Sequence, residues 1–292
     1  MAIDRTEPAQ PAPLLQNWKL TLAYDGTAFR GWQVQPNEIT VQGELQAALE
    51  RILGESPLPQ GSGRTDAGVH ALGQVASFVL AAPIPAENLQ RALNRTLPPA
   101  IRVLRARTAP NAFHARHSAV AKTYEYRVFR DAICPPFLAP YVYAYSRPMD
   151  GSALQRSARL FEGQHDFLSF AATDSDLAGQ TFNQDAKLDL RPIPRPGFQI
   201  EAPTAPTVRT IFSSCWEERQ TEAGTLLVYR VRGSGFLHHM VRNLVGTMLD
   251  VGRGRLSADE IPGILAARNR TAAGPTAPAR GLFLHSVEYE EL

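Results

Sequence analysis

The sequence predicts an α+β protein built as two sheet-based α/β lobes of similar build. Short runs of alternating apolar and polar residues predict strands, and these runs alternate with helix-like runs in two comparable series. The 292 residues suffice for one large domain or two of ordinary size. We place the lobes at residues 17–111 and 112–292. Residues 1–16, rich in Ala, Pro and Gln, predict a disordered tail.

The first lobe is predicted from strand alternation and helix caps. Trp18, Leu20, Leu22 and Tyr24 alternate with polar or small residues, which indicates a strand. Thr40 is a candidate N-cap for a helix that Gly54 ends. The expected order is a strand at 18–24, a helix at 41–52, a strand at 75–80, a helix at 86–97 and a strand at 101–107.

The second lobe repeats this kind of pattern. A capping box at 257–260 predicts the start of a short helix that runs toward Arg268. A proline-rich insertion at 174–207 has little periodicity, so we expect a functional or disordered connection there. The expected order is a strand at 124–128, a helix at 150–161, strands at 211–216 and 226–232, a helix at 237–251, the short helix and a strand at 282–289.

Composition excludes several classes of protein. Cys134 and Cys215 are the two cysteines, too few for a disulfide framework, and they form no Cys-x-x-Cys pair, which suits a reducing cytoplasm. No dinucleotide or phosphate-loop motif and no cysteine and histidine cluster of zinc spacing is present. Residues 1–16 contain no apolar run of the kind that predicts a membrane anchor. We expect neither cofactor nor metal, and no membrane association.

Positive charge concentrates in residues 91–130. This stretch holds nine basic residues and one acidic residue, in a chain whose net charge is only +2. A local excess of this kind suits a phosphate backbone, with unrelated solvated side chains as the alternative.

The run Gly63-Arg64-Thr65-Asp66-Ala67-Gly68 is the strongest candidate for a reactive site. The small residues leave room for a substrate to approach Asp66, and Arg64 is expected to keep that carboxylate ionised. An accessible, ionised carboxylate can act as a nucleophile or a base. From the residues alone, an ordinary turn held by a local Arg–Asp pair is equally consistent.

Several blocks in fixed order resemble the family of bacterial tRNA pseudouridine synthases of type A. The blocks are GRTDAGVH (63–70), YDGTAFRGWQ (24–33), FHARHSA (113–119), KTYEY (122–126), FLHHMVRNLVG (236–246) and, more weakly, GLFL (281–284). Together they span most of the chain beyond residue 16. The resemblance implies two α/β lobes with the active-site cleft between them. It also implies cofactor-free isomerisation of uridine to pseudouridine in the anticodon arm of tRNA (tRNA positions 38, 39 and 40) by a homodimer.

The resemblance also assigns the candidate catalytic residues. It implies that Asp66 is essential, and that Tyr124, the first tyrosine of its block, lies in the active site. The ring of Tyr124 can stack on uracil and its hydroxyl can exchange a proton, although alternation along a strand alone favours a core role. Arg242 lies in an apolar helix and needs a partner, for which Asp66 is the candidate by resemblance. The alternative for Arg242 is a solvated helix face.

Contacts with RNA are expected from four further residues. Arg64 is expected to pair with Asp66 or to fill the gap left by a flipped-out uridine. His114, Arg116 and Lys122 are expected to meet phosphates, with generic surface charge as the rival explanation. Adjacent histidines on a helix point about 100° apart. His238 and His239 are therefore expected to pack or to contact phosphate rather than to share a metal ion.

Two other functions remain open at this level. The chain would be a noncatalytic RNA-binding module if the fold were kept without its reaction. It would be a hydrolase of small molecules if Asp66 served as the nucleophile of a hydrolytic reaction. The basic stretch argues against the hydrolase, and the presence of Asp66, Tyr124 and Arg242 argues against a pure binding module.

Overall fold

A computed structural model of the chain describes residues 15–172 and 207–290. Its helices are α1 (Val41–Leu53), α2 (Ala86–Thr96), α3 (Gly151–Arg159), α5 (Met240–Gly252) and α6 (Ile261–Ala267). Its strands are β1 (Gln16–Tyr24), β2 (Gln60–Gly61), β3 (His70–Leu80), β4 (Ile101–Ala109), β5 (Ala119–Phe129), β6 (Tyr143–Ala144), β7 (Gly163–Asp166), β8 (Val208–Thr221), β9 (Gly224–Gly233) and β10 (Leu282–Tyr289). The predicted α+β class is confirmed.

The described strands form one continuous ten-stranded sheet rather than two separate ones. Eight of them follow the order β4-β1-β3-β10-β5-β9-β8-β7, with β2 paired to β3 and β6 to β5. The strand β10, from the C-terminal end of the chain, lies parallel to β3 and antiparallel to β5, and so joins the two halves. The boundary at residue 111 stays a prediction. The insertion at 174–207 lies, except for Thr207, outside the described residues, as does the expected tail up to residue 14; Gln16 already belongs to β1.

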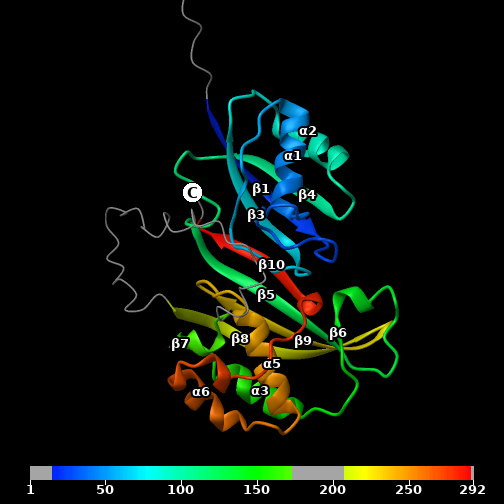
Figure 1. Ribbon diagram of the computed structural model, residues 1–292, viewed down its shortest axis with the longest axis vertical. Coiled ribbons are helices and arrows are strands. Elements are labelled where there is room, and N and C mark those ends of the chain that lie inside the picture. The colour runs from blue at the N-terminus through cyan, green and yellow to red at the C-terminus, as the bar shows by residue number, and fades with distance from the viewer. Residues whose placement is uncertain (1–14, 173–206, 291–292) are drawn as a thin grey trace, which may run out of the picture.

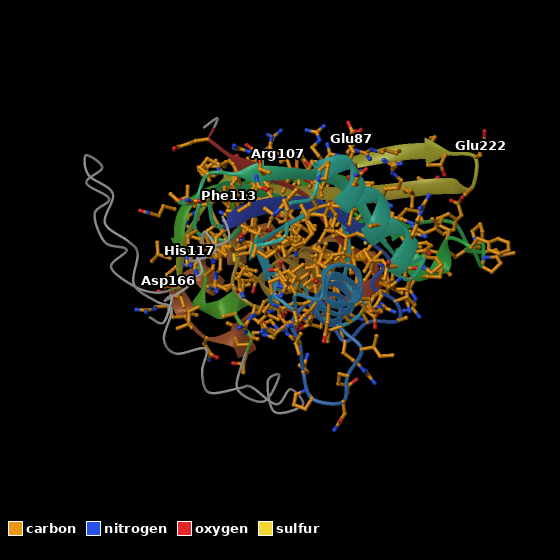
Figure 2. The ribbon with its side chains drawn as sticks, turned by 90° about the horizontal axis from the view of Figure 1, so that it is seen from above. Glu87, Arg107, Phe113, His117, Asp166 and Glu222 are labelled. Carbon is orange, nitrogen blue, oxygen red and sulfur yellow. The ribbon has the colours of Figure 1, made fainter. Side chains whose placement is uncertain are left out.

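Helices cover the sheet in two groups (Figure 1). The helices α1 and α2 lie with β1, β3 and β4, whereas α3, α5 and α6 lie with β8 and β9. The buried side chains of both groups belong to one hydrophobic cluster, which contains Trp18 of β1, Tyr126 of β5 and Tyr229 of β9. Figure 2 shows Glu222, at the turn between β8 and β9, at one end of the molecule and Phe113 and His117 at the other.

Local signals explain why the elements begin and end where they do. The Thr40 side chain accepts a hydrogen bond from the backbone of Gly43, and Gly54 ends α1 in the left-handed region at φ 69°. Ser257 and Glu260 form the predicted capping box. The described part of the chain contains no helix that is long and apolar enough to cross a membrane.

One predicted helix begins later than expected. The apolar run predicted a helix from residue 237, but α5 begins at Met240 because His239 adopts a left-handed backbone at φ 60°. A residue in that region cannot continue a right-handed helix. His238 and His239 therefore lie in the turn before the helix, and this changes where their side chains point.

Candidate active site

The loop that carries Asp66 connects β2 to β3 and is held by the segment after β1. The backbone of Trp32 donates a hydrogen bond to the carbonyl of Thr65 at 3.0 Å, and the Tyr24 hydroxyl meets the Thr65 hydroxyl at 2.8 Å. The backbone N–H of Gly68 donates to the Phe29 carbonyl at 3.3 Å. Thr65 and Gly68, which lie on either side of Asp66 in the loop, are thus both held by hydrogen bonds, and this keeps Asp66 in one place.

Two glycines allow this close contact between backbones. A Cβ on Gly31, whose φ is +90°, would lie 2.5 Å from the Thr65 carbonyl oxygen. A Cβ on Gly26 would collide with the carbonyl of Val69. The glycines of the YDGTAFRGWQ block therefore serve the Asp66 loop, because only glycine fits where the two backbones meet.

Arg242 reaches Asp66 from the first turn of α5. Its Nη1 donates to Oδ2 of Asp66 at 2.8 Å, and its Nε donates to the carbonyl of Ala277 at 2.8 Å. The ion pair predicted between Arg242 and Asp66 is confirmed. It joins two residues 176 positions apart, and it satisfies an arginine whose side chain is only 16% exposed.

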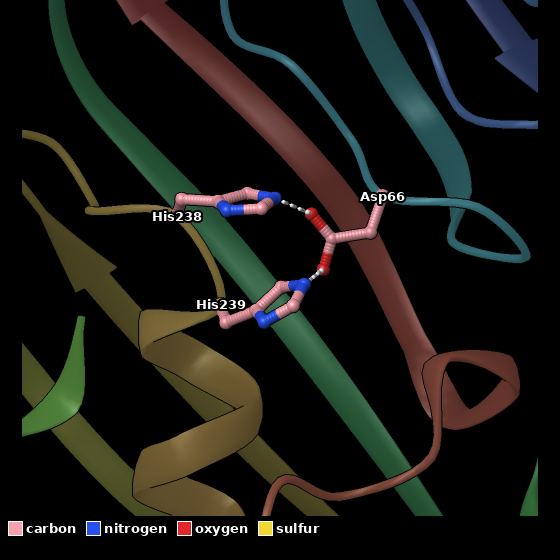
Figure 3. A group of neighbouring side chains, drawn as sticks. All are labelled: Asp66, His238 and His239. Atoms are coloured by element: carbon pink, nitrogen blue, oxygen red, sulfur yellow. Dashed lines mark ion pairs between the residues drawn. The ribbon is translucent and has the colours of Figure 1, made fainter. Parts of the chain in front are cut away.

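Two histidines complete the surroundings of the Asp66 carboxylate (Figure 3). Nε2 of His238 lies 3.2 Å from Oδ1, and Nε2 of His239 lies 3.4 Å from Oδ2. Burial opposes ionisation of Asp66, but the hydrogen bond from His238 and the charges of His239 and Arg242 outweigh it. The pKa of Asp66 is lowered to about 2. Asp66 is therefore an ionised carboxylate whose side chain is still 13% exposed.

The expectation that these histidines pack or contact phosphate did not include their contact with Asp66, and a phosphate contact stays a prediction. It assumed that both residues lie on a helix with their rings about 100° apart. The left-handed turn at His239 instead directs Nε2 of each ring toward Asp66. The two ring centroids lie 4.1 Å apart. Their position within four residues of Arg242 in the sequence was the available signal.

Among the described residues, Asp66, His238 and His239 form the group whose ligand atoms could hold a metal ion, within 4.8 Å of one another. Arg242 already brings a positive charge to within 2.8 Å of Asp66, and this charge repels a divalent cation at the same oxygen. The residues therefore fit an arginine-neutralised carboxylate better than a metal site. The lack of a metal cofactor stays a prediction.

Tyr124 lies on the face of β5 that carries the active site. Its ring packs edge-on against Phe236 with centroids 5.0 Å apart, and its side chain is buried. Burial, with further contributions from Tyr24 and Asp66, raises the pKa of Tyr124, so the phenol keeps its proton. The alternation predicted for Tyr124 and Tyr126 is confirmed, and Tyr126 packs in the core with its hydroxyl on the Pro278 carbonyl at 2.9 Å.

The structure brings Arg64, Arg116 and Lys122 together beside the Asp66 loop. Lys122 follows the same face of β5, and its Nζ donates to the Ser62 carbonyl at the start of that loop. Burial, then Arg116 and Arg209, lower the pKa of Lys122 to about 8. Burial and Arg116 likewise lower the pKa of Arg64. Arg209 is a member of this basic group that the sequence did not single out.

The structure corrects the expected role of Arg64 and gives His114 a contact within its own turn. Arg64 does not keep Asp66 ionised: in the described part of the chain, His238, His239 and Arg242 do so. His114 closes its own turn, because its Nδ1 accepts hydrogen bonds from the backbone of Arg116 at 3.1 Å and of His117 at 3.3 Å. A phosphate contact by His114 stays a prediction.

Comparison with known proteins agrees with this arrangement. A family model described as tRNA pseudouridine synthase matches residues 21–118 and 195–290. The chain is 48% identical over 273 residues to a protein of Solibacter usitatus named tRNA pseudouridine synthase A, covering 93% of this chain and 98% of that protein. It is 42% identical over 273 residues to a protein of the same name from Moorella thermoacetica, with the same shares covered.

Proposed function

This chain belongs to the tRNA pseudouridine synthase family, and from that premise we propose that it isomerises uridine to pseudouridine in tRNA with Asp66 as its catalytic group. The observation that carries the proposal is the Asp66 carboxylate held at 2.8 Å by Arg242 and flanked by two imidazoles. Such a group is ionised, fixed in position and partly exposed, as a nucleophile or base must be.

The reaction leaves the elemental composition of the substrate unchanged. The N1–C1′ bond of uridine breaks, the base turns, a C5–C1′ bond forms, the proton on C5 leaves and N1 gains a proton. Asp66 acts on the sugar or the base as nucleophile, or removes a sugar proton. In each case the charges of Arg242 and the histidines hold the carboxylate for reaction.

Tyr124 completes the catalytic group. Its ring offers a surface on which uracil can stack, and its protonated hydroxyl can exchange a proton with the reacting carbon. The target uridine is extruded from the anticodon arm, because its reacting atoms are out of reach in a stacked stem. Arg64, Arg116 and Lys122 bind the phosphates around it, and Arg64 fills the gap left in the stack.

The assembly follows from the family resemblance. We infer a homodimer in which the anticodon arm reaches across both subunits, and a cytoplasmic place of action, where tRNA is found. Sedimentation of the purified chain with and without tRNA tests the stoichiometry. A monomer that forms one-to-one complexes would contradict the dimer.

Tritium release tests the reaction itself. Unmodified tRNA transcripts labelled at C5 of uridine should lose tritium to water with no change of product mass other than the isotope exchange. Binding without tritium release would favour the RNA-binding module. A product heavier by one water would favour the hydrolase. Mapping of pseudouridine by carbodiimide-dependent stops of reverse transcription tests whether the modified uridines lie in the anticodon arm.

A further inference from the structure

A cavity of about 300 Å³ opens beside the active site. Its wall comes from the turn after β1, the end of the Asp66 loop and the segments that precede β6 and β10. The residues that line it are Thr27, Gly68, Pro140, Pro278, Ala279 and Arg280. Gly68 belongs to the Asp66 loop, and the other five take no part in the contacts of the Asp66 carboxylate described above.

The cavity is joined to the catalytic ion pair through its own walls. Gly68 follows Asp66 by two residues in the same loop. Pro278 follows Ala277, whose carbonyl accepts the Nε hydrogen bond of Arg242. Both halves of the ion pair are therefore held by residues that line this cavity or lie close to its lining in sequence.

Most of the lining of the cavity is apolar, and two of its residues, Gly68 and Ala279, are small. Pro140, Pro278 and Ala279 offer flat carbon surfaces, and Gly68 adds no side chain. Gly68 has φ +77°, and a Cβ there would lie 3.5 Å from that of Ala279. The Thr27 hydroxyl is already committed to Asp25 at 2.6 Å. Shape and apolar contact therefore dominate, which suits the flat face of a nucleobase.

Arg280 gives the rim of the cavity a fixed positive charge. Its Nε donates to the Val142 carbonyl at 3.1 Å, and its own carbonyl meets Nε2 of His70 at 3.2 Å. In the described part of the chain, no carboxylate forms an ion pair with Arg280. Its charge is thus not neutralised by an ion pair there, and the planar fork of a guanidinium matches a phosphate.

We propose that this cavity binds a second nucleotide of the tRNA, next to the target uridine, with its base on the proline and alanine floor and its phosphate on Arg280. The inference rests on the proposed function. Extrusion of the target removes a stacking partner from its neighbours. An apolar cavity beside Asp66 replaces that lost contact for one of them.

Substituted RNAs test the proposal together with Ala279→Leu, which fills the cavity. An anticodon-arm RNA with an abasic site at one neighbour of the target should bind the wild type about 10-fold more weakly. A 10-fold loss is about 1.4 kcal/mol, which corresponds to losing the burial of roughly 55 Å² of apolar surface. Ala279→Leu should bind the intact RNA about 10-fold more weakly, and the abasic site should cause little further loss.

The phosphate contact has a separate test that does not depend on packing. A neutral methylphosphonate linkage beside the target should weaken binding to the wild type but not to Arg280→Gln. Arg280→Gln should also reduce the salt dependence of binding by about one phosphate contact. Arg51→Gln is the matched control, because Arg51 is an exposed arginine of α1 whose Nε also donates to a backbone carbonyl, that of Ala47 at 3.3 Å.

Two outcomes would overturn the inference. One is an abasic scan in which wild type and Ala279→Leu respond equally at both neighbours. The other is a methylphosphonate effect that Arg280→Gln leaves unchanged. Both outcomes are read from RNA binding. Failure of the proposed function would instead appear as a wild-type protein that binds tRNA and forms no pseudouridine, so the two failures can be told apart.

Discussion

Two carboxylates, Asp66 and Glu125, lie on opposite sides of β5, and both are held by cationic partners. Asp66 is held over one face by Arg242 at 2.8 Å. Glu125, on the other face, is held by Arg127 at 2.8 Å and Arg230 at 2.9 Å. Burial opposes ionisation of both groups, yet their cationic partners lower the pKa of each below its usual value.

The difference between them is access rather than charge. Glu125 is fixed in the middle of a strand, directly opposite Arg230 in the register of β5 and β9, and its side chain is only 3% exposed. Asp66 lies in a loop with small neighbours, next to Tyr124, and is 13% exposed. A depressed pKa therefore marks both a structural and a catalytic carboxylate, and the loop position separates them.

Removing one arginine partner from each carboxylate should give the largest difference in activity between two variants. Arg242→Ala takes the closest charge from Asp66 and a hydrogen bond from Ala277, so we expect a loss of about 3 kcal/mol in stability and of more than ~100-fold in pseudouridine formation. Arg230→Ala leaves Arg127 on Glu125 and should cost about 1 kcal/mol with normal activity.

Chemical denaturation and tritium release measure these two effects on the same preparations. Equal loss of activity in both variants, at matched folded fractions, would mean that the two carboxylates do not differ in role.

Tyrosine substitutions sharpen the comparison within the active-site face of β5. Tyr124→Phe keeps the ring contact with Phe236 but removes the hydroxyl, so the rate should fall about 10²–10⁴-fold if that group exchanges a proton. Tyr126→Phe removes a hydrogen bond to Pro278 and should cost about 1 kcal/mol of stability with little change in rate. Single-turnover kinetics measure the rate of each variant. A wild-type rate for Tyr124→Phe would show that the Tyr124 hydroxyl takes no part in the mechanism.

The free energy of unfolding should depend on pH in the acid range because of Asp66. Its pKa falls from the usual 3.8 to about 2 in the folded state, so its ionised form stabilises the fold above about pH 4. This contribution, about 2 kcal/mol, is lost as the pH falls from about 4 to about 2. The difference in unfolding free energy between wild type and Asp66→Asn should narrow over that range. A difference that stays constant would show that Asp66 is not specially stabilised.

The smallest effect is expected at the basic group beside the loop. Arg116→Gln should weaken tRNA binding less than 10-fold and reduce the salt slope by about one contact, because it removes one phosphate partner. Arg51→Gln, on α1, controls for the loss of a surface charge. Filter binding over a series of salt concentrations measures both, and an unchanged slope for Arg116→Gln would place it outside the interface.

Local signals in the sequence predicted most of the elements. The Thr40 cap, the Gly54 stop and the alternation of Tyr124 with Tyr126 all act between residues close in sequence, and the structure contains each of them. The single sheet could not be predicted in this way. It depends on the pairing of β10 with β3 and β5, two strands that lie far from β10 in the sequence.

The site shows the same division. The motif predicted Asp66 and its ion pair with Arg242. It did not predict the histidine contacts, because these depend on a left-handed residue at position 239, which helix periodicity conceals. The sequence also led us to expect that Arg64 keeps Asp66 ionised, because the two residues are so close in the loop. In the described part of the chain, His238, His239 and Arg242 do so instead.

The central claim is that Asp66, and not the equally charged Glu125, carries the reaction. The most direct test is pseudouridine formation on tRNA by wild type, Asp66→Asn and Glu125→Gln, with folding and tRNA binding verified for each. We predict no product from Asp66→Asn and product at close to the wild-type rate from folded Glu125→Gln. Product from Asp66→Asn at the wild-type rate would contradict the account.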